Sequence, residues 1–538
     1  MLCVDKTGTL TENRMQLRRL ATATAEIRVD AGQALPEAVH PLLEFGLLAS
    51  RRAGLDPMDR ALFQLGDGAL ADSAHLHPDW LLEREYPLTP DLLAMSQAWM
   101  GDDGCRYMAA KGAPEAVFDL CHLPTPEAAA WQQRVRDLAE QGLRVLAVAR
   151  GQSMGPSAPE HQHDPDFELL GLLGFEDPLR PSVPAAVAQA HQAGMAVVMI
   201  TGDHAATALA IARQAGLQVE AGVLTGADMA QMDDTALAQA VRSVRVFARV
   251  MPEQKLRLVE ALARNGETVA MTGDGVNDAP ALKAAHIGIA MGRRGTDVAR
   301  EAAGLVLLDE DFGRIVGGVR RGRRIADNLR KVMTYITAIH VPIAGLALLP
   351  VLFGLPPLLL PAHVVLTEMV IDPVCSLAFE GAPEDPRVMQ RPPRRRQDGI
   401  VGWPMVWQGL LQGGCLLAAT LAIYLLSLRS DLGADAARTL AVVGLTVGNL
   451  MLVAVNVIQG LGWRALFAGG ARAFWWVAAA AALVLGLALA LPPARALLHF
   501  ALPAPVLLLP TLLAVALAVA VGALLGRAVG VQPQRLLR

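Results

Sequence analysis

Three short apolar runs of the sequence end in residues that can bind and transfer a phosphoryl group. These runs are LCVD (2–5), AVVMITGD (196–203) and TVAMTGDG (268–275). Asp5, which ends the first run, is a carboxylate that can attack a phosphoryl group and form an acyl phosphate. Gly8 and its small neighbours would let backbone N–H groups approach the phosphate closely. The pattern predicts phosphoryl chemistry at the carboxyl ends of parallel strands.

Other polar residues suit the same chemistry. The Thr201 hydroxyl can donate to a phosphate oxygen, and Lys255 in PEQK is a fixed ammonium that can neutralise phosphoryl charge. Asp274 and Asp278 lie four residues apart beside glycines, and paired carboxylate oxygens of this kind suit Mg²⁺. Asn277 can add a neutral hydrogen bond to the phosphate.

Each of these motifs also has a purely structural interpretation. TGD alone is typical of any exit from a strand into a turn, and a single lysine in PEQK is typical of a solvated helix. GDGVNDAP (273–280) is harder to explain without a ligand, because it holds two acids and two glycines in six residues. The four motifs together, in this order, favour one phosphoryl-transfer site.

The order of the motifs resembles that of P-type ATPases, members of the haloacid dehalogenase superfamily. The resemblance rests on DKTGTLT (5–11), KGAPE (111–115), DPLR (177–180), TGD (201–203) and GDGVNDAP (273–280), and it covers nearly the whole chain. It implies an α/β, Rossmannoid phosphorylation domain at 1–15 and 165–330, an inserted α+β nucleotide-binding domain at 16–164, and an all-α transmembrane domain of six helices at 331–538. ATP and Mg²⁺ are the implied substrate and cofactor, and Asp5 is the implied phosphorylated residue.

The resemblance also assigns roles residue by residue. Lys111 and Gly112 of KGAPE would line the ATP pocket, Arg144 would reach the phosphates, and Asp177 of DPLR would touch the ribose region. The remaining implied sets are Asp5, Thr7, Thr201, Lys255 and Asn277 for catalysis, Gly202 and Asp203 for the cofactor, and Asp5, Thr7, Asp274 and Asp278 for Mg²⁺.

The stretch that would recognise adenine matches the family pattern less closely than the other motifs do. DPMDRAL (56–62) resembles a family stretch of the nucleotide domain, and EYPLTPDLLAMS (85–96) resembles the stretch that carries an aromatic residue stacked on adenine. In this chain Leu88 stands at the expected position, with Tyr86 nearby.

Composition separates the chain into a charged head and an apolar C-terminal part. At 538 residues the chain is too long for one domain. It is 53% hydrophobic with a mean hydropathy of +0.36, which is too apolar for an ordinary soluble protein. The net charge of −4 gives no basic field for nucleic acid. The five cysteines are scattered, with no CxxC motif or Cys/His cluster, so neither a disulfide framework nor a zinc site is expected.

Six apolar segments follow residue 331, each near the ~20 residues that span a bilayer as a helix. They are 333–353, 358–379, 402–427, 438–459, 473–491 and 505–526. Six such runs leave almost no polar face, which argues against buried helices of a soluble protein. Arginines gather in alternate connectors and after the last segment, so an integral membrane protein with a cytoplasmic head and C-terminus, in the plasma (inner) membrane, is expected.

The second apolar segment holds the candidate residues for a transported ion. LTEMVIDPVCSL (366–377) resembles the ion-binding sixth helix of the family and places Glu368 and Asp372 one turn apart. An acid inside a bilayer helix costs roughly 2.5–3.5 kcal/mol on insertion scales, so such acids usually mark function. A position at the membrane interface or in a structural pair is the alternative. Pro373 can loosen the helix and free carbonyls for a cation.

Two further sets of polar membrane residues admit two interpretations each. His340 is either a proton-sensitive ligand or a helix residue bonded to a neighbouring carbonyl. Asn449, Asn456 and Gln459 either line the ion pathway or bond helix to helix.

The function expected from this resemblance is an ATP-driven cation pump, since heavy-metal pumps have only two membrane helices after such a head. Family members carry an actuator domain and four helices before the phosphorylated aspartate, whereas this sequence starts four residues before Asp5. We therefore expect a fragment, a truncated gene product or one half of a split pump, with a separate chain supplying the rest, and no pumping by this chain alone. A membrane-tethered phosphatase and a non-transporting remnant are the alternatives. KGAPE argues against the first, and the intact phosphoryl motifs argue against lost chemistry.

Overall fold

The structure is a computed structural model of the chain. The residues it describes are 1–30, 34–52, 56–71, 73–89, 91–153, 157–373, 377–394, 399, 402–430, 432–459, 461–467 and 472–530, of which 370–373 and 529–530 are described for the backbone only. The chain divides into two compact units, Met1–Val316 and Gly317–Arg538.

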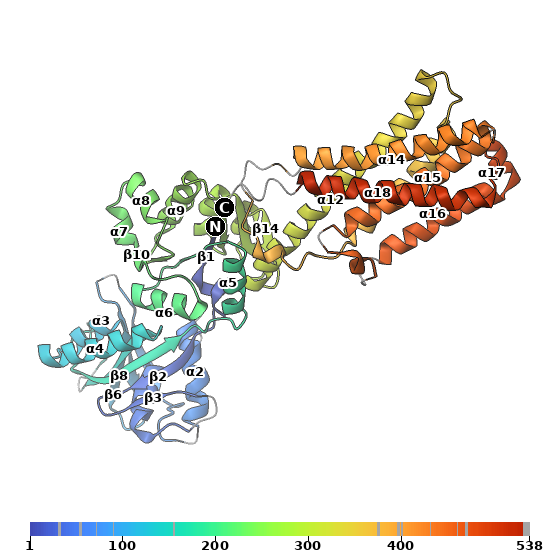
Figure 1. Cartoon of the computed structure of the whole chain (residues 1–538). Helices are drawn as coiled ribbons and strands as arrows, with labels where there is room; N and C mark the ends of the chain where they lie inside the picture. Colours follow the sequence, from blue (N-terminus) through green and yellow to red (C-terminus); the bar gives the residue numbers. More distant parts are fainter. Residues whose placement is uncertain are drawn as a thin grey trace. The chain divides into compact units, whose positions relative to one another are not determined.

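The first unit contains a seven-stranded parallel sheet in the order β10-β11-β9-β1-β12-β13-β14 (Figure 1). Its strands are β1 (Leu2–Asp5), β9 (Val197–Ile200), β10 (Val223–Thr225), β11 (Val246–Ala248), β12 (Ala270–Gly273), β13 (Ile287–Met291) and β14 (Leu305–Leu307). The connecting helices are α5 (Val183–Gln192), α6 (Ala205–Ala215), α7 (Gly226–Ala230), α8 (Asp234–Ala240), α9 (Pro252–Arg264), α10 (Ala279–Ala284) and α11 (Asp297–Ala302). Strand β1 lies at the centre, between β9 and β12.

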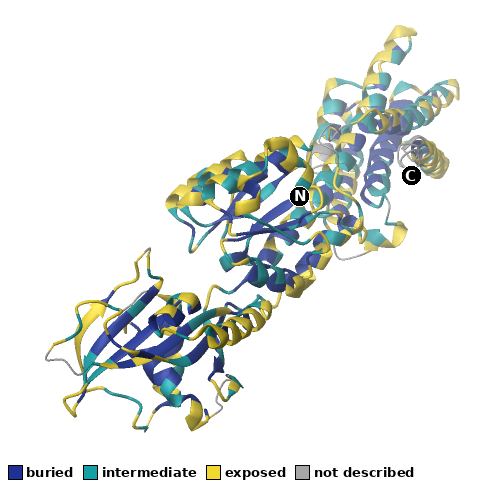
Figure 2. Ribbon diagram, turned by 90° about the vertical axis from the view of Figure 1, so that its left-hand side faces the viewer, coloured by how far each residue is buried: buried dark blue, intermediate teal, exposed yellow. Residues whose placement is uncertain are grey.

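The central strands are apolar on both faces because helices cover both sides of the sheet. All four residues of β9 are buried, as are Leu2, Cys3 and Val4 of β1. In Figure 2 the central strands of this sheet are dark blue, whereas the outward surfaces of the helices are teal and yellow. The strand that ends in Asp5 is therefore held rigidly.

The same unit contains a second seven-stranded sheet, entirely antiparallel, in the order β3-β2-β8-β7-β6-β5-β4. Its strands are β2 (Gln16–Ala21), β3 (Glu26–Arg28), β4 (Leu81–Tyr86), β5 (Ala94–Met100), β6 (Arg106–Gly112), β7 (Arg144–Ser153) and β8 (Phe167–Glu176). Its helices are α1 (His40–Leu48), α2 (Pro57–Ala69), α3 (Pro114–Leu120) and α4 (Thr125–Glu140). The limits of the two head domains stay a prediction; the antiparallel sheet itself runs to Glu176.

Side chains of the antiparallel sheet alternate between two cores, as the two-residue period of a strand requires. Ala109 of β6 and Val148 of β7 pack with α1 and α2, whereas their neighbours Met108, Ala110 and Ala147 pack with α3 and α4. Both faces of this sheet are therefore covered.

The second unit is all-helical. Its described helices are α13 (Pro361–Pro373), α14 (Trp403–Arg429), α15 (Ala434–Val457), α16 (Arg472–Ala490), α17 (Pro492–Leu497) and α18 (Leu508–Gly530), together with most of α12 (Phe312–Leu352). Among the described residues, five helices are long and apolar enough to cross a membrane: α12, α14, α15, α16 and the helical segment Pro505–Ala528. The predicted α/β and all-α fold classes are confirmed.

The second predicted membrane segment, 358–379, is described only in part. Its described helix, α13, has 13 residues, which is about 20 Å at 1.5 Å per residue. Residues 374–376 lie outside the described part of the chain and residues 377–380 are helical again, so the sixth full span stays a prediction.

Glycines let the long helices approach closely, as is usual where lipid supplies no hydrophobic driving force. A Cβ atom on Gly413 of α14 would lie 2.3 Å from the Ala338 carbonyl oxygen of α12, and one on Gly409 would lie 2.8 Å from that of Thr334. The backbone of α12 therefore packs directly against α14.

Candidate active site

Three neighbouring strands of the parallel sheet bring the predicted phosphoryl-binding residues together. Asp5 ends β1, Thr201 follows β9, and Asp274 follows β12. Because the three strands are parallel and adjacent, their carboxyl ends meet at one edge of the sheet. The backbone N–H of Asp5 donates to the Thr272 hydroxyl of β12 at 3.1 Å, which ties the two strand ends together.

Lys255 lies in the first turn of α9 and joins two carboxylates across this edge. Its Nζ donates to Asp5 Oδ2 at 2.7 Å and to Asp278 Oδ1 at 2.7 Å. The side chains of all three are at most 15% exposed. The ammonium is thus shielded from water and held beside Asp5, where phosphoryl charge would develop.

The acids of the site oppose one another electrostatically. Burial raises the pKa of Asp5 even though Lys255 acts in the opposite direction, and Asp278 raises it further. Burial together with Asp5 and Asp278 also raises the pKa of Asp274. Burial would lower the pKa of Lys255, but the two carboxylates outweigh it and raise that pKa. One lysine therefore faces more negative charge than it neutralises.

The donor set fits Mg²⁺ in part. Asp5 and Asp274 are crowded carboxylates whose mutual repulsion a divalent cation would relieve, and carboxylate oxygens are ligands that Mg²⁺ accepts. Asp278 differs, because its Oδ1 accepts from Lys255 and its Oδ2 accepts from the N–H groups of Asp274 and Gly275 at 3.2 and 3.1 Å. In this conformation Asp278 orients Lys255 and the turn after β12.

The residues after β9 lie beside the same edge. Thr201 is buried, and its hydroxyl accepts from the N–H of Asp203 at 3.1 Å. Asp203 Oδ2 accepts from Lys6 Nζ at 2.6 Å, a pairing that sequence analysis did not find. Asn277 is exposed on the turn Val276–Asp278, so its side chain is free to move towards a ligand.

The loop after Asp5 is held by groups from two other segments. Thr11 donates to Asp177 Oδ2 at 2.5 Å, and the N–H of Arg14 donates to Asp177 Oδ1 at 3.2 Å. The carbonyl of Gly8 accepts from Arg294 at 2.7 Å and from Arg180 at 3.2 Å. Arg180 belongs to the DPLR motif, but no sequence signal pointed to Arg294.

Gly8 is required at this loop for two reasons. Its φ of +76° lies in the left-handed region, and a Cβ there would lie 2.5 Å from the Arg294 guanidinium. The loop that follows Asp5 therefore depends on glycine for its shape.

Comparisons with known proteins agree with this geometry. Residues 1–286 match the model of the haloacid dehalogenase-like hydrolases, and residues 356–527 match the model described as cation transporting ATPase, C-terminus. The chain belongs to the P-type cation-transporting ATPases of the haloacid dehalogenase-like family. The predicted resemblance is thereby confirmed.

Curated relatives of the P-type ATPase family extend the match. A calcium-transporting ATPase of Bacillus subtilis is 33% identical over 467 residues, which cover 79% of this chain and 52% of that protein. A probable cation-transporting ATPase F of Mycobacterium tuberculosis is 36% identical over 491 residues, covering 82% of this chain and 53% of that protein. The calcium-transporting ATPase 1 of Saccharomyces cerevisiae is 32% identical over 475 residues, which cover 80% of this chain and 50% of that protein. The chain spans about half the length of these relatives.

The KGAPE motif places Lys111 inside the antiparallel sheet rather than on an open surface. Lys111 is buried, and its Nζ donates to Ser50 Oγ at 2.5 Å and to the Asp59 carboxylate of DPMDRAL. Burial lowers the pKa of Lys111, although Asp59 acts in the opposite direction. In this P-type ATPase chain the two motifs therefore join through a buried ion pair, and the predicted contact of Lys111 with ATP stays a prediction.

Other residues predicted to bind nucleotide vary in accessibility. Gly112 allows close strand packing, because a Cβ there would lie 2.4 Å from the Leu93 carbonyl oxygen. Arg144 begins β7 and is exposed. Leu88 is 57% exposed, whereas Tyr86 is 7% exposed and donates its hydroxyl to the Pro159 carbonyl. Of these two, only Leu88 is placed to meet a ligand.

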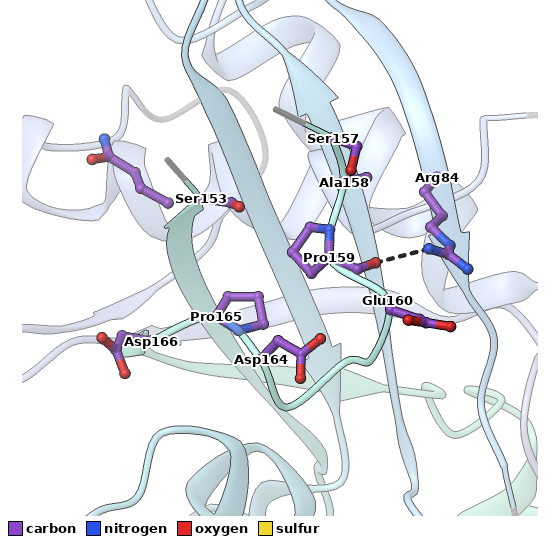
Figure 3. Close-up of a pocket in the computed structure, with 10 residues that line it drawn as sticks. Arg84, Ser153, Ser157, Ala158, Pro159, Glu160, Asp164, Pro165 and Asp166 are labelled. Carbon is purple, nitrogen blue, oxygen red and sulfur yellow. Dashed lines mark hydrogen bonds between the residues drawn. The ribbon is translucent and has the colours of Figure 1, made fainter. Parts of the chain in front are cut away.

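A pocket of about 570 Å³ lies in the antiparallel domain and contains none of the predicted site residues (Figure 3). Arg84 donates to the Pro159 carbonyl at 2.9 Å. Figure 3 shows this bond on one side of the pocket, with Glu160, Asp164 and Asp166 spaced along its wall. Three carboxylates against one guanidinium disfavour a triphosphate, so we do not assign ATP to this pocket.

The membrane unit shows which hydrogen bonds two of its polar residues make. The Nδ1 atom of His340 lies 2.8 Å from the Ile336 carbonyl and therefore donates to it, which is the helix-bonded interpretation. Asn456 Nδ2 donates to Gln412 Oε1 of α14 at 3.0 Å, a bond between helices. Glu368 is half-buried on α13, and the Asp372 side chain lies outside the described part of the chain.

Proposed function

We propose that this chain carries the ATP-dependent phosphorylation machinery and the C-terminal membrane part of a cation pump, with Asp5 as the phosphorylated residue. The observation that carries the proposal is the Lys255 ammonium held 2.7 Å from both Asp5 and Asp278 at the end of β1. The relatives named as calcium- or cation-transporting ATPases support the same assignment.

The chemistry is a phosphoryl transfer to a carboxylate. An Asp5 oxygen attacks the γ-phosphorus of ATP, the bond between that phosphorus and the bridging oxygen breaks, and ADP leaves. Lys255 then exchanges its hydrogen bond to Asp5 for one to the transferred phosphoryl group. Thr201 and Asn277 donate to the remaining oxygens. Attack of water on the acyl phosphate later restores Asp5 and releases phosphate.

Asp5 and Asp274, with Thr7, are the residues that would hold Mg²⁺. A bound ion would supply positive charge that offsets the repulsion between the attacking carboxylate and the phosphate. Asp278 contributes by fixing Lys255 and the turn that carries Asp274.

The nucleotide and ion assignments complete the proposal. Lys111, Gly112, Arg144, Asp177, Gly202 and Asp203 form the nucleotide-binding set, and Asp177 acts in this conformation by anchoring the phosphorylation loop. Glu368 and Asp372 supply oxygens to a transported cation. The protein is integral to the membrane, and we propose the plasma (inner) membrane with the head in the cytoplasm. A separate chain with the remaining segments of the family is a proposed partner.

The test is phosphorylation of the full chain by ATP labelled on the γ-phosphate, in membranes with Mg²⁺. We expect an acid-stable label that hydroxylamine removes, as an acyl phosphate requires, and no label in Asp5→Asn. Asp297→Asn, which changes an exposed aspartate on α11, is the matched control and should label normally. Release of phosphate from esters without any label from ATP would favour the phosphatase. No label and no hydrolysis would favour the remnant.

A further inference from the structure

A cluster of histidines and glutamates lies in the antiparallel domain, apart from every residue assigned above. Glu37, His40 and His75 each offer one ligand atom, and these atoms lie within 4.8 Å of one another. Glu37 and His40 flank the start of α1, whereas His75 comes from the segment between α2 and β4. Because 35 residues separate His40 from His75, the fold and not the sequence assembles the cluster.

We propose that Glu37, His40 and His75 form a binding site for a divalent transition-metal ion of the zinc class. Two imidazole nitrogens and one carboxylate oxygen form a ligand set that zinc accepts, with a further position open to water. Imidazole nitrogen disfavours Mg²⁺ and Ca²⁺, which prefer oxygen. The site therefore differs in chemistry from the aspartate set around Asp5.

His40 already has the orientation of a metal ligand. Its Nε2 lies 2.9 Å from the Leu35 carbonyl oxygen, and because a carbonyl only accepts, Nε2 carries the proton. Its Nδ1 is buried, lacks a hydrogen-bond partner and lies 3.2 Å from Glu37 Oε2. Metal-bound histidines typically donate their second ring N–H to a carbonyl or carboxylate in this way.

His75 shows the same arrangement with a carboxylate behind it. Its Nδ1 donates to Glu44 Oε2 at 2.5 Å, and its Nε2 lies 2.9 Å from Glu37 Oε1. Glu44 is buried on α1, and its other oxygen accepts from His77 Nε2 at 2.7 Å. The His77 ring stacks on Trp80 with 3.8 Å between centroids, so the residues behind His75 are held in place.

Closing the site requires its ligand atoms, which lie within 4.8 Å of one another, to approach to the spacing that a bound ion imposes. Tetrahedral zinc with ligands about 2.0–2.1 Å away places ligand atoms about 3.3 Å apart. The His40 and His75 rings meet edge-on with centroids 5.3 Å apart, and each has a nitrogen facing Glu37. Glu37 is 80% exposed, so it can turn towards an ion from solvent.

The experiment is a Zn²⁺ titration of the full chain in detergent against a chromophoric chelator, with excess Mg²⁺ to occupy hard-oxygen sites. We expect one tight Zn²⁺ per chain and at least about 100-fold weaker binding in the double variant His40→Gln, His75→Gln. Glu44→Gln, which removes the support behind His75, should weaken binding about 10- to 100-fold. The control is the double variant His122→Gln, His163→Gln, a second histidine pair with ring centroids 6.3 Å apart, which should bind normally.

Two further measurements keep the proposal open to contradiction. Glu37→Gln changes only an exposed side chain, so it should fold normally and bind Zn²⁺ about tenfold more weakly. Co²⁺ in place of Zn²⁺ should give visible absorption without a thiolate charge-transfer band, since Cys105 is exposed and is the competing kind of ligand. Unchanged affinity in Glu37→Gln, or a thiolate band that persists in the double variant, would overturn the assignment.

Discussion

The ammonium of Lys255 lies 2.7 Å from Oδ2 of Asp5, although 250 residues separate the two in sequence. Burial raises the pKa of Asp5, and the pairing with Lys255 opposes that rise because it favours the ionised carboxylate. The pairing also keeps the nucleophile hydrogen-bonded until a substrate with greater negative charge takes the ammonium. We therefore propose that Lys255 pairs with Asp5 before the transfer and with the phosphoryl group during it.

Replacing Lys255 tests this double role. Lys255→Met should slow phosphorylation of Asp5 about 100- to 1,000-fold at saturating ATP, as expected for loss of one preorganised donor. Lys255→Arg keeps the charge and should recover part of the rate. The measurement is the rate of label incorporation in a rapid-quench experiment. A normal rate in Lys255→Met would show that this ammonium does not stabilise the transfer.

The raised pKa of Asp5 predicts how stability changes with pH. Because the folded pKa lies above the unfolded one, ionised Asp5 destabilises the fold at pH values above the folded pKa. Asp5→Asn should therefore raise the Tm of the chain near neutral pH. The gain should shrink as the pH falls through the raised pKa and be gone below about 3.9, the ordinary value for aspartate. Thermal unfolding in detergent across this pH range measures the gain in Tm. A lower Tm for Asp5→Asn than for the unchanged chain at neutral pH would contradict the electrostatic account.

Asp274 is the clearest candidate for a metal ligand among the acids of the site, since Asp278 already uses both oxygens. Asp274→Asn should raise the Mg²⁺ concentration needed for half-maximal phosphorylation, by about tenfold or more if it is a direct ligand. Excess Mg²⁺ should restore most of the labelling. Asp278→Asn should instead lower the rate without such rescue, because it disturbs Lys255. An unchanged Mg²⁺ requirement in Asp274→Asn would remove it from the metal set.

The buried pair of Lys111 and Asp59 predicts that KGAPE contributes to stability. Lys111→Ala leaves the Asp59 carboxylate buried without its cation, which typically costs about 3–5 kcal/mol. The double variant Lys111→Met, Asp59→Leu removes both charges and should be less destabilised than the single one. Measuring both the Tm and the ATP affinity of each variant separates the structural role of Lys111 from a role in nucleotide binding. If the double variant is stable but binds no ATP, Lys111 also contacts the nucleotide.

The sequence predicted the parallel sheet and its strand-end residues because each strand is a short apolar run followed at once by polar chemistry. The pairings of Lys6 and Arg294 were not found. Lys6 and Asp203 both lie in quoted motifs, but neither motif indicates that the two side chains pair, whereas Arg294 lies outside every motif. The extent of the second membrane segment, 358–379, stays a prediction, because residues 374–376 lie outside the described part of the chain.

The bond between Asn456 and Gln412 yields a last prediction, on whether the polar residues of α15 bond helices together. Asn456 Nδ2 donates to Gln412 Oε1 at 3.0 Å and to its own helix at Leu452 O at 2.9 Å. Hydrogen bonds between membrane helices average about 0.6 kcal/mol and reach at most about 1.7 kcal/mol. Asn456→Leu should therefore lower the Tm in detergent only slightly, and Gln412→Leu should add little to it, because both remove the same bond.

Ser427→Ala is the matched control for this pair, since the Ser427 hydroxyl donates within its own helix to the Ile423 carbonyl at 2.7 Å. Ser427→Ala should leave the hydrogen bond between Asn456 and Gln412 intact, so its effect on the Tm should add to that of Asn456→Leu. Cation dependence of phosphorylation distinguishes the alternative role in the ion pathway. A shift in the cation concentration for half-maximal effect in Asn456→Leu, with an unchanged Tm, would mean that Asn456 faces the transported ion and that its bond to Gln412 is secondary.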